Sequence, residues 1–236
     1  NDVVRILQKA TNLSCTAAAE RVFRKYSVLL KPEGSLQARF DIVSSFATEY
    51  ELVSKLAECL AGSAVRVRKQ PDGSLLYVSE SKDKYTIDVI HDEVDTNHFQ
   101  GVYYITAEWR FFTMEALLHL ESRPGREGGI KYGVRIYANS DSRILSILAR
   151  FSFVDRYLLR EVNDVVAKFD TVYGQMLQDP LENQKKLLEY RDPKATIYFT
   201  DPEIDLIKDF VDQLLKSQST NAPPASGVLE GTTSGR

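Results

Sequence analysis

Cysteine, long apolar runs and an excess of one charge are all missing from this chain, and each absence excludes a class of protein. Two cysteines, Cys15 and Cys59, are too few and too far apart for a disulfide framework, and their apolar helical contexts favour buried free thiols. No apolar run approaches the roughly 18 residues of a membrane span, so we expect no transmembrane segment. Lys and Arg number 30 against 33 Asp and Glu, and this balance gives no broad basic face for nucleic acid.

The short motifs of common catalytic sites are missing as well. The sequence contains no GxxxxGK[ST] phosphate loop, no GxGxxG between a strand and a helix, no GxSxG turn and no HExxH pair. Neither cysteine has a histidine nearby in the sequence, although such a partner can be remote. We therefore assign no catalytic residue, no metal and no cofactor, and lean against an enzyme.

The composition that is present suits a globular protein with a sizeable core. Of the 236 residues, 43% are hydrophobic and 27% are charged, which is ordinary for a soluble domain. We expect a cytoplasmic location. The chain begins at Asn1 rather than Met, which is typical of a fragment or a processed form, so a removed targeting segment stays possible.

The first third of the chain predicts a helix, a strand and a second helix. Apolar residues recur at helical spacing within residues 1–30, and KPEG at 31–34 breaks the pattern. The alternation in SLQARFDIV then predicts a half-buried strand near residues 36–42. A capping box of Thr48 and Glu51 predicts the start of the next helix, and Gly62 its end.

Residues 63–137 predict a run of antiparallel strands. The Asp72-Gly73 pair is a strong hairpin signal, and RPGREGG at 123–129 predicts a second turn. VYYITAEWRFF at 102–112 is read as one long central strand. Its period of two separates an inner row from an outer row that carries Glu108 and Arg110. The inner row is Tyr103, Ile105, Ala107, Trp109 and Phe111.

Helices and a tail follow the strands. Apolar residues at helical spacing predict a long helix over 143–173, capped by Asp141 or Ser142. Asp179-Pro180 predicts a short helix at 180–190, and Asp201-Pro202 the start of another. The stretch from Ser217 onward is rich in Ser, Thr, Gly and Pro, and we predict that it is disordered.

This order of elements resembles the helix-grip fold of the START-like, or polyketide-cyclase-like, superfamily. The predicted fold class is α+β, with a curved antiparallel sheet of about six to seven strands wrapped on a long C-terminal helix. The predicted domains are an N-terminal helical extension at 1–34, the helix-grip domain at 35–175, a C-terminal helical extension at 176–216 and a disordered tail at 217–236. The family usually has two short helices after its first strand, and this sequence predicts one clear helix there.

The resemblance implies a cavity between the sheet and the long helix. Family members bind sterols, phospholipids, hormones or polyketides there, and some catalyse cyclisation or hydrolysis. Inward aromatic and aliphatic residues suit either a ligand pocket or a filled core. The predicted lining is Tyr85, Ile87, Tyr103, Ile105, Trp109, Phe111, Leu118, Tyr132, Val134, Leu148, Phe151 and Leu158.

Two polar features have modest interpretations. HDEVDTNH at 91–98 gathers five potential cation ligands, but its spacing matches no zinc or calcium loop and favours a polar turn. His119 lies on the outer alternate of its strand, which favours a solvent-facing or covering-layer histidine over a catalytic one. Glu108 and Arg110 share the outer face of theirs and are interpreted as surface charges.

Three functions remain open. The first is non-enzymatic binding of a hydrophobic or amphipathic, lipid-like molecule in the cavity. The second is an interaction or assembly module with a filled or vestigial cavity, in which the terminal helices contact a protein partner or a second copy. The third, a cyclase- or hydrolase-like enzyme, has the least support, because no acid–base pair falls on the predicted inner face.

Overall fold

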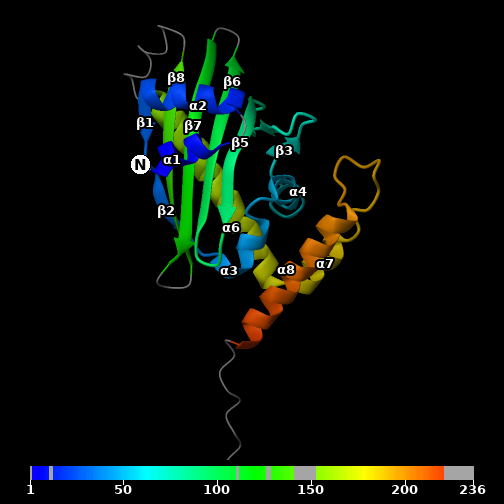
Figure 1. Ribbon diagram of the computed structural model, residues 1–236. Helices are drawn as coiled ribbons and strands as arrows, with labels where there is room; N and C mark the ends of the chain where they lie inside the picture. The colour runs from blue at the N-terminus through cyan, green and yellow to red at the C-terminus, as the bar shows by residue number, and fades with distance from the viewer. Residues whose placement is uncertain (1, 11–12, 110–111, 126–128, 141–152, 221–236) are drawn as a thin grey trace, which may run out of the picture.

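The protein is an α+β structure built on one open, eight-stranded antiparallel sheet (Figure 1). The computed structural model describes residues 2–10, 13–109, 112–125, 129–140 and 153–220. The strand order is β1-β8-β7-β6-β5-β4-β3, and β2 also pairs with β8. The strands are β1 Val28–Leu30, β2 Glu33–Leu36, β3 Arg66–Lys69, β4 Leu75–Val78, β5 Lys84–Val94, β6 Phe99–Trp109, β7 Phe112–Pro124 and β8 Ile130–Ser140.

Helices cover both faces of the sheet. On the outer face, α1 (Asp2–Lys9) and α2 (Leu13–Lys25) pack on the central strands, and on the inner face α6 (Phe153–Gln178) runs along the sheet (Figure 1). The remaining helical segments are α3 Phe40–Val43, η1 Ser44–Phe46, α4 Tyr50–Ala61, α7 Pro180–Leu187 and α8 Asp201–Thr220. Among the described residues, no helix has both the length and the apolar character needed to cross a membrane.

Two layers of apolar packing result from this arrangement. On the outer face, Val3, Leu7 and Val22 of the N-terminal helices pack with Val102 and Leu117 of the sheet. The larger inner core joins β6 to α3, α4, α6 and α8. Because the period of two sends neighbouring residues to opposite faces, a strand covered on both sides is apolar at both alternates. The outer alternate of β6 is therefore buried at Val102 and Tyr104.

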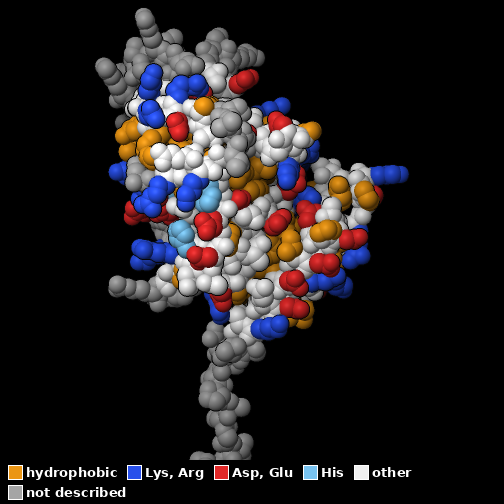
Figure 2. Space-filling view, in the orientation of Figure 1, with side chains coloured by type: hydrophobic (Ala, Val, Ile, Leu, Met, Phe, Trp, Pro, Cys, Tyr) orange, Lys and Arg blue, Asp and Glu red, His pale blue; other side chains and the backbone are white. Residues whose placement is uncertain are grey.

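The surface seen in Figure 2 carries both signs of charge. Lys and Arg side chains are interspersed with Asp and Glu over α1, α2 and the neighbouring strands. Several of these charges form ion pairs, including Arg21 with Glu115 at 2.7 Å. This face therefore has the mixed character that a net charge of −3 suggests.

The N-terminal third differs from the sequence prediction. Residues 1–30 are not helical throughout, because α2 ends at Lys25 and β1 follows. The predicted strand at 36–42 is wrong: β2 ends at Leu36, and residues 40–46 are helical. The strands within residues 28–36 form because they pair with β8. Beyond Leu36 the alternating apolar residues are buried without forming a strand, since Ala38 and Phe40 pack in the inner core.

This correction changes the order of elements in two ways. The sheet begins at Val28, inside the predicted N-terminal extension at 1–34. Two helical segments, α3 with η1 and then α4, follow β2, where the sequence predicted one clear helix. Tertiary contacts explain the segment that the sequence missed, α3 with η1, because Phe46 packs edge-to-face on Phe210 of α8, with the ring centroids 4.8 Å apart.

Local turn and end signals gave mixed results. The Asp72-Gly73 hairpin is confirmed, with Gly73 at φ 89° and Asp72 accepting the Ser74 N–H. Gly62 ends α4 in the left-handed region at φ 61°, also as predicted. The Thr48 capping box is wrong, because α4 starts at Tyr50 and the Glu51 carboxylate accepts the N–H of Lys69 in β3 instead.

The central hairpin and the C-terminal helices also refine the prediction. VYYITAEWRFF is not one strand, because β6 ends at Trp109 and its pairing partner Phe112 begins β7. No Gly, Pro or Asn in the sequence marks this break between the two strands. Asp179 caps α7 as predicted by accepting the Glu182 N–H. The helix α8 continues to Thr220, so residues 217–220 are helical rather than disordered, while 141–152 and 221–236 lie outside the described residues.

Candidate ligand cavity

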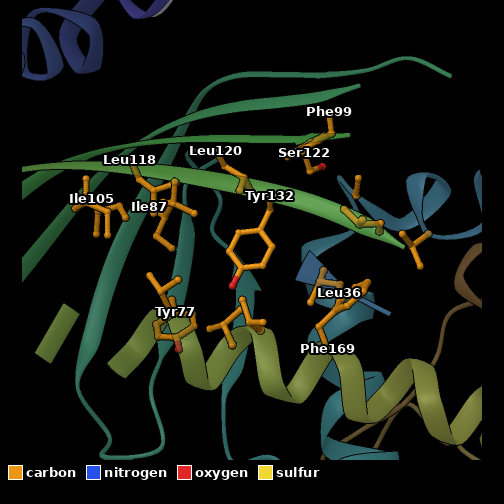
Figure 3. A pocket seen from close by; sticks show the side chains of 18 of the residues that line it. Leu36, Tyr77, Ile87, Phe99, Ile105, Leu118, Leu120, Ser122, Tyr132 and Phe169 are labelled. Carbon is orange, nitrogen blue, oxygen red and sulfur yellow. The ribbon is translucent and has the colours of Figure 1, made fainter. Parts of the chain in front are cut away.

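A cavity of about 380 Å³ lies between the inner face of the sheet and α6 (Figure 3). Its floor consists of inward side chains of β5, β6, β7 and β8, and its opposite wall contains Val162, Val166 and Phe169 of α6. Its size falls within the range of small-molecule pockets, about 300–1,000 Å³. Val165 also lines it and is 48% exposed, so the α6 wall reaches the protein surface.

The floor follows from the alternation along β7. The inward residues of β7 are Met114, Ala116, Leu118, Leu120 and Ser122, and all five line the cavity. Ala116 pairs in register with Ile105 on one side and with Ala138 on the other. Because Ala116 and Ala138 are neighbours and have small side chains, little side-chain volume projects from the sheet at that point. The space between the layers therefore depends on small side chains as well as on the distance to the helix.

One end of the cavity is closed by residues that the sequence analysis missed. Phe40, Val43, Ser44 and Ala47, from α3, η1 and the residue after it, line this end together with Leu36. They were missed because this segment was predicted as a strand. The spacing of Phe40, Val43 and Ala47 at i, i+3 and i+7 is a helical signal that would have found them.

The structure brings together six of the predicted lining residues. Tyr85, Ile87, Ile105, Leu118, Tyr132 and Val134 all line the cavity. The side chains of Trp109, Phe111, Leu148, Phe151 and Leu158 lie outside the described residues.

Tyr103 is inward, as predicted, but it is a core residue and is not among those that line the cavity. Its hydroxyl lies 3.2 Å from the Tyr50 hydroxyl, and Tyr50 in turn donates to Asp92 at 3.0 Å. Burial is the main cause that raises the pKa of Tyr103 to about 12, so the hydroxyl stays protonated. This chain of hydrogen bonds fastens α4 to β5 and β6.

The polar atoms of the described lining are few and are almost all hydroxyl groups. Tyr132 extends from β8 toward α6, with Ser122 beside it on β7 (Figure 3). The Tyr132 ring packs over Gly34, where an added Cβ would lie 2.7 Å from the ring carbon Cζ. Burial raises the pKa of Tyr132, and the Asp170 carboxylate raises it further. A fixed, neutral phenol therefore faces this end of the cavity.

The opposite end contains an aromatic pair. Tyr77 of β4 and Tyr85 of β5 are partners in register, and their rings pack edge-to-face with centroids 5.6 Å apart. Met114 completes this end of the lining. Charged side chains, imidazoles and thiols are all missing from the lining within the described part of the chain. The arrangement can therefore solvate apolar groups and hydrogen-bond neutral ones.

His119 lies on the other face of the sheet and is buried. It is 1% exposed, and its Nε2 is 3.0 Å from Gln100 Nε2 and 3.2 Å from Glu121 Oε1. The sequence favoured a histidine that either faces solvent or lies beneath a covering layer. The second interpretation is confirmed and the first is wrong, because α1 and α2 cover this face. Burial lowers the pKa of His119, which favours the neutral imidazole.

The HDEVDTNH segment forms the hairpin between β5 and β6, as the polar-turn interpretation predicted. Asp95 accepts the Asn97 N–H at 2.7 Å, whereas Asp92 accepts from Tyr50 on the inner face. His91 pairs with Glu93 at 3.5 Å. These side chains have different partners, and among the described residues no group of His, Cys, Asp and Glu is placed to hold a metal ion.

The surroundings of the two cysteines make their thiols weakly reactive. Burial raises the pKa of Cys15 to about 12 and that of Cys59 to about 11. The thiolate is the reactive form of cysteine, so both groups are protonated and weakly nucleophilic at neutral pH. Both are free, as the sequence analysis expected, but the expected burial holds only for Cys15, since Cys59 is half-buried.

Comparisons with known proteins find partial similarity to solved structures. No protein-family model matches the chain, and no curated protein matches it either. A conserved protein from Geobacillus kaustophilus is similar in structure, with a TM-score of 0.47 and 12% identity over 63% of this chain and 97% of the other. An uncharacterized protein from Rhizobium leguminosarum gives a TM-score of 0.44 and 11% identity over 62% and 94%. Neither description mentions an activity or a ligand.

Proposed function

We propose that this protein binds a hydrophobic or amphipathic small molecule, lipid-like in character, in the cavity between the sheet and α6. The observation that carries this proposal is a cavity of about 380 Å³ whose described lining is almost entirely apolar. Exposed or water-filled apolar surface of this extent is unfavourable unless a ligand covers it. The function is binding rather than catalysis, since the described lining offers no carboxylate or imidazole for acid–base chemistry.

The order of elements supports membership of the helix-grip superfamily as part of this proposal. A short strand pair, two helical segments, six antiparallel strands and a long helix follow one another from Val28 to Gln178. The second helical segment removes the departure from the family pattern that the sequence suggested. In this superfamily the space between sheet and helix is the ligand site, which is where the cavity lies.

The alternative of an assembly module has less support. It requires terminal helices with free apolar faces, but Ile207, Val211 and Leu214 of α8 are fully buried in the inner core. Val3 and Val22 of the N-terminal helices are likewise buried on the outer face. These helices cover the protein's own sheet and core, so their amphipathic pattern needs no partner.

Fluorescence titration with the uncharged apolar dye N-phenyl-1-naphthylamine tests the proposal. The wild-type protein should bind the dye, and Ala116→Phe should abolish binding because a phenyl group would fill the apolar part of the cavity beside Met114. The matched control is Ala167→Phe, which adds the same group to an exposed position of α6. Circular dichroism and thermal melting establish that both variants are folded.

Native mass spectrometry of freshly purified protein gives a second measurement. A copurified ligand should add a fixed mass to the wild-type protein and not to Ala116→Phe. Dye binding that is equal in the wild type, Ala116→Phe and Ala167→Phe would place the dye elsewhere and refute the proposed site. A folded wild-type protein that binds no dye and carries no added mass would refute the function itself.

A further inference from the structure

The cavity has a polar end made of two hydroxyl groups from neighbouring strands. Ser122 and Tyr132 pair in register across β7 and β8, and both line the cavity. Both side chains leave the inner face of the sheet, but they diverge, because the Tyr132 ring turns away from β7 and lies over Gly34 of β2. Within the described part of the chain, neither hydroxyl is hydrogen-bonded to another residue. Each therefore has its hydrogen-bonding capacity available to a molecule in the cavity.

The chemistry of this end suits a neutral group. A hydroxyl donates one hydrogen bond and accepts two, so it pairs equally well with an alcohol or a carbonyl. An ionised head group would find no counter-charge in the described lining, and an unpaired buried charge is strongly unfavourable. The Asp170 carboxylate acts on Tyr132 from α6, which opposes an anion at this end still more. Asp170 itself is engaged, since it accepts the Gln37 N–H.

The length of the cavity floor accommodates an extended chain. Its floor follows β7 from Ser122 to Met114, a distance of about 27 Å for eight residues at a rise of about 3.4 Å each. The polar pair is at one end of this path, and the intervening inward residues Leu120, Leu118 and Ala116 are apolar. An extended alkyl or isoprenoid chain can lie along this row with its polar group at Ser122.

We propose that the cavity takes a neutral, single-chain amphipathic molecule whose hydroxyl or carbonyl group is hydrogen-bonded by Tyr132 at the end of the cavity that also holds Ser122, with its chain along β7 toward Met114. This inference rests on the proposed function and adds the class of ligand and the residues that select it. Tyr132 is the more important of the two, because its ring is held against Gly34 and its hydroxyl needs no rearrangement before binding.

Competition against N-phenyl-1-naphthylamine at pH 7.5 tests the selection, with 1-decanol, decanoate and decylammonium as ligands of equal chain length. In the wild-type protein, decanol should displace the dye at a concentration at least tenfold lower than either ion. Tyr132→Phe should weaken decanol binding about three- to tenfold, the effect of one lost hydrogen bond, and leave dye affinity within twofold. Tyr26→Phe removes the same hydroxyl from an exposed tyrosine on the outer side and should change neither value.

The outcomes separate this inference from the function on which it rests. Dye binding with equal displacement by decanol and decanoate would overturn the neutral class and leave the proposed function intact. Decanol binding that is unchanged in Tyr132→Phe combined with Ser122→Ala would overturn the assigned polar end. Failure of the wild-type protein to bind either the dye or decanol would overturn both proposals together.

Discussion

Glu203 at the start of α8 should be a major source of stability, because one carboxylate makes four short contacts. It accepts from Lys55 Nζ of α4 at 2.7 and 2.9 Å, and from the backbone N–H and the hydroxyl of Thr200 at 2.8 and 3.0 Å. The side chains are only 13% exposed for Glu203 and 24% for Lys55. The contacts fasten α8 to α4 and begin the helix at the same time.

The expected cost of Glu203→Ala is about 3 kcal/mol of unfolding free energy. Hydrogen bonds to a charged group contribute about 1.5–3 kcal/mol each. The partly buried bonds from Lys55 fall in this range, and the exposed bonds from Thr200 contribute less. The ion pair adds more than an exposed pair, which is worth about 0–1 kcal/mol, and less than a fully buried one. Glu203→Gln keeps an oxygen acceptor for Thr200 and should cost only about 1–2 kcal/mol.

Urea unfolding followed by circular dichroism measures these differences. Lys55→Met removes the ammonium group and keeps most of the chain, so a double-mutant cycle with Glu203→Gln isolates the pair, with an expected coupling of about 1 kcal/mol. Lys208→Met serves as a control, because its pair with Asp205 lies on the exposed face of α8. A cost below about 0.5 kcal/mol for Glu203→Ala would refute the reasoning, since solvent must then replace all four contacts.

Two further predictions concern titration and reactivity. Because burial lowers the pKa of His119 in the folded protein, the unfolded chain binds the proton first as the pH falls. The free energy of unfolding should therefore decrease as the pH falls below about 6.5. Between pH 7.5 and 5.5, His119→Gln should lose less stability than the wild type. Identical decreases in the urea midpoints of the two proteins would contradict this. Cys15, with a pKa near 12, should react with a thiol reagent such as dithionitrobenzoate at least tenfold more slowly in native protein than in urea. The reaction is followed in Cys59→Ser, so that Cys15 is the thiol measured. Equal rates in native and urea-unfolded protein would show that Cys15 is accessible in the folded state.

The faces of the strands were predictable from the sequence because they depend on local geometry. Side chains alternate across any strand, so the period of two placed Tyr103, Ile105 and Ala107 inward without knowledge of the fold. The same reasoning found the Asp72-Gly73 turn and the end of α4 at Gly62, where positive φ angles favour glycine. Six of the predicted lining residues face the cavity for this reason.

Tertiary structure decided the features that depend on distant contacts. Pairing with β8 and burial against α8 made residues 28–36 strands and residues 40–46 helical, although the local alternation favoured a strand at 36–42. Tyr103 is inward, but Tyr50 of α4 engages its hydroxyl, and no local pattern contains that contact. Periodicity states which way a side chain points, whereas the volume in front of it depends on what the rest of the chain places there. The sequence alone therefore determined that Tyr103, Ile105 and Ala107 face inward, and only the packing of α3, η1 and α6 against the sheet decided that a cavity lies there.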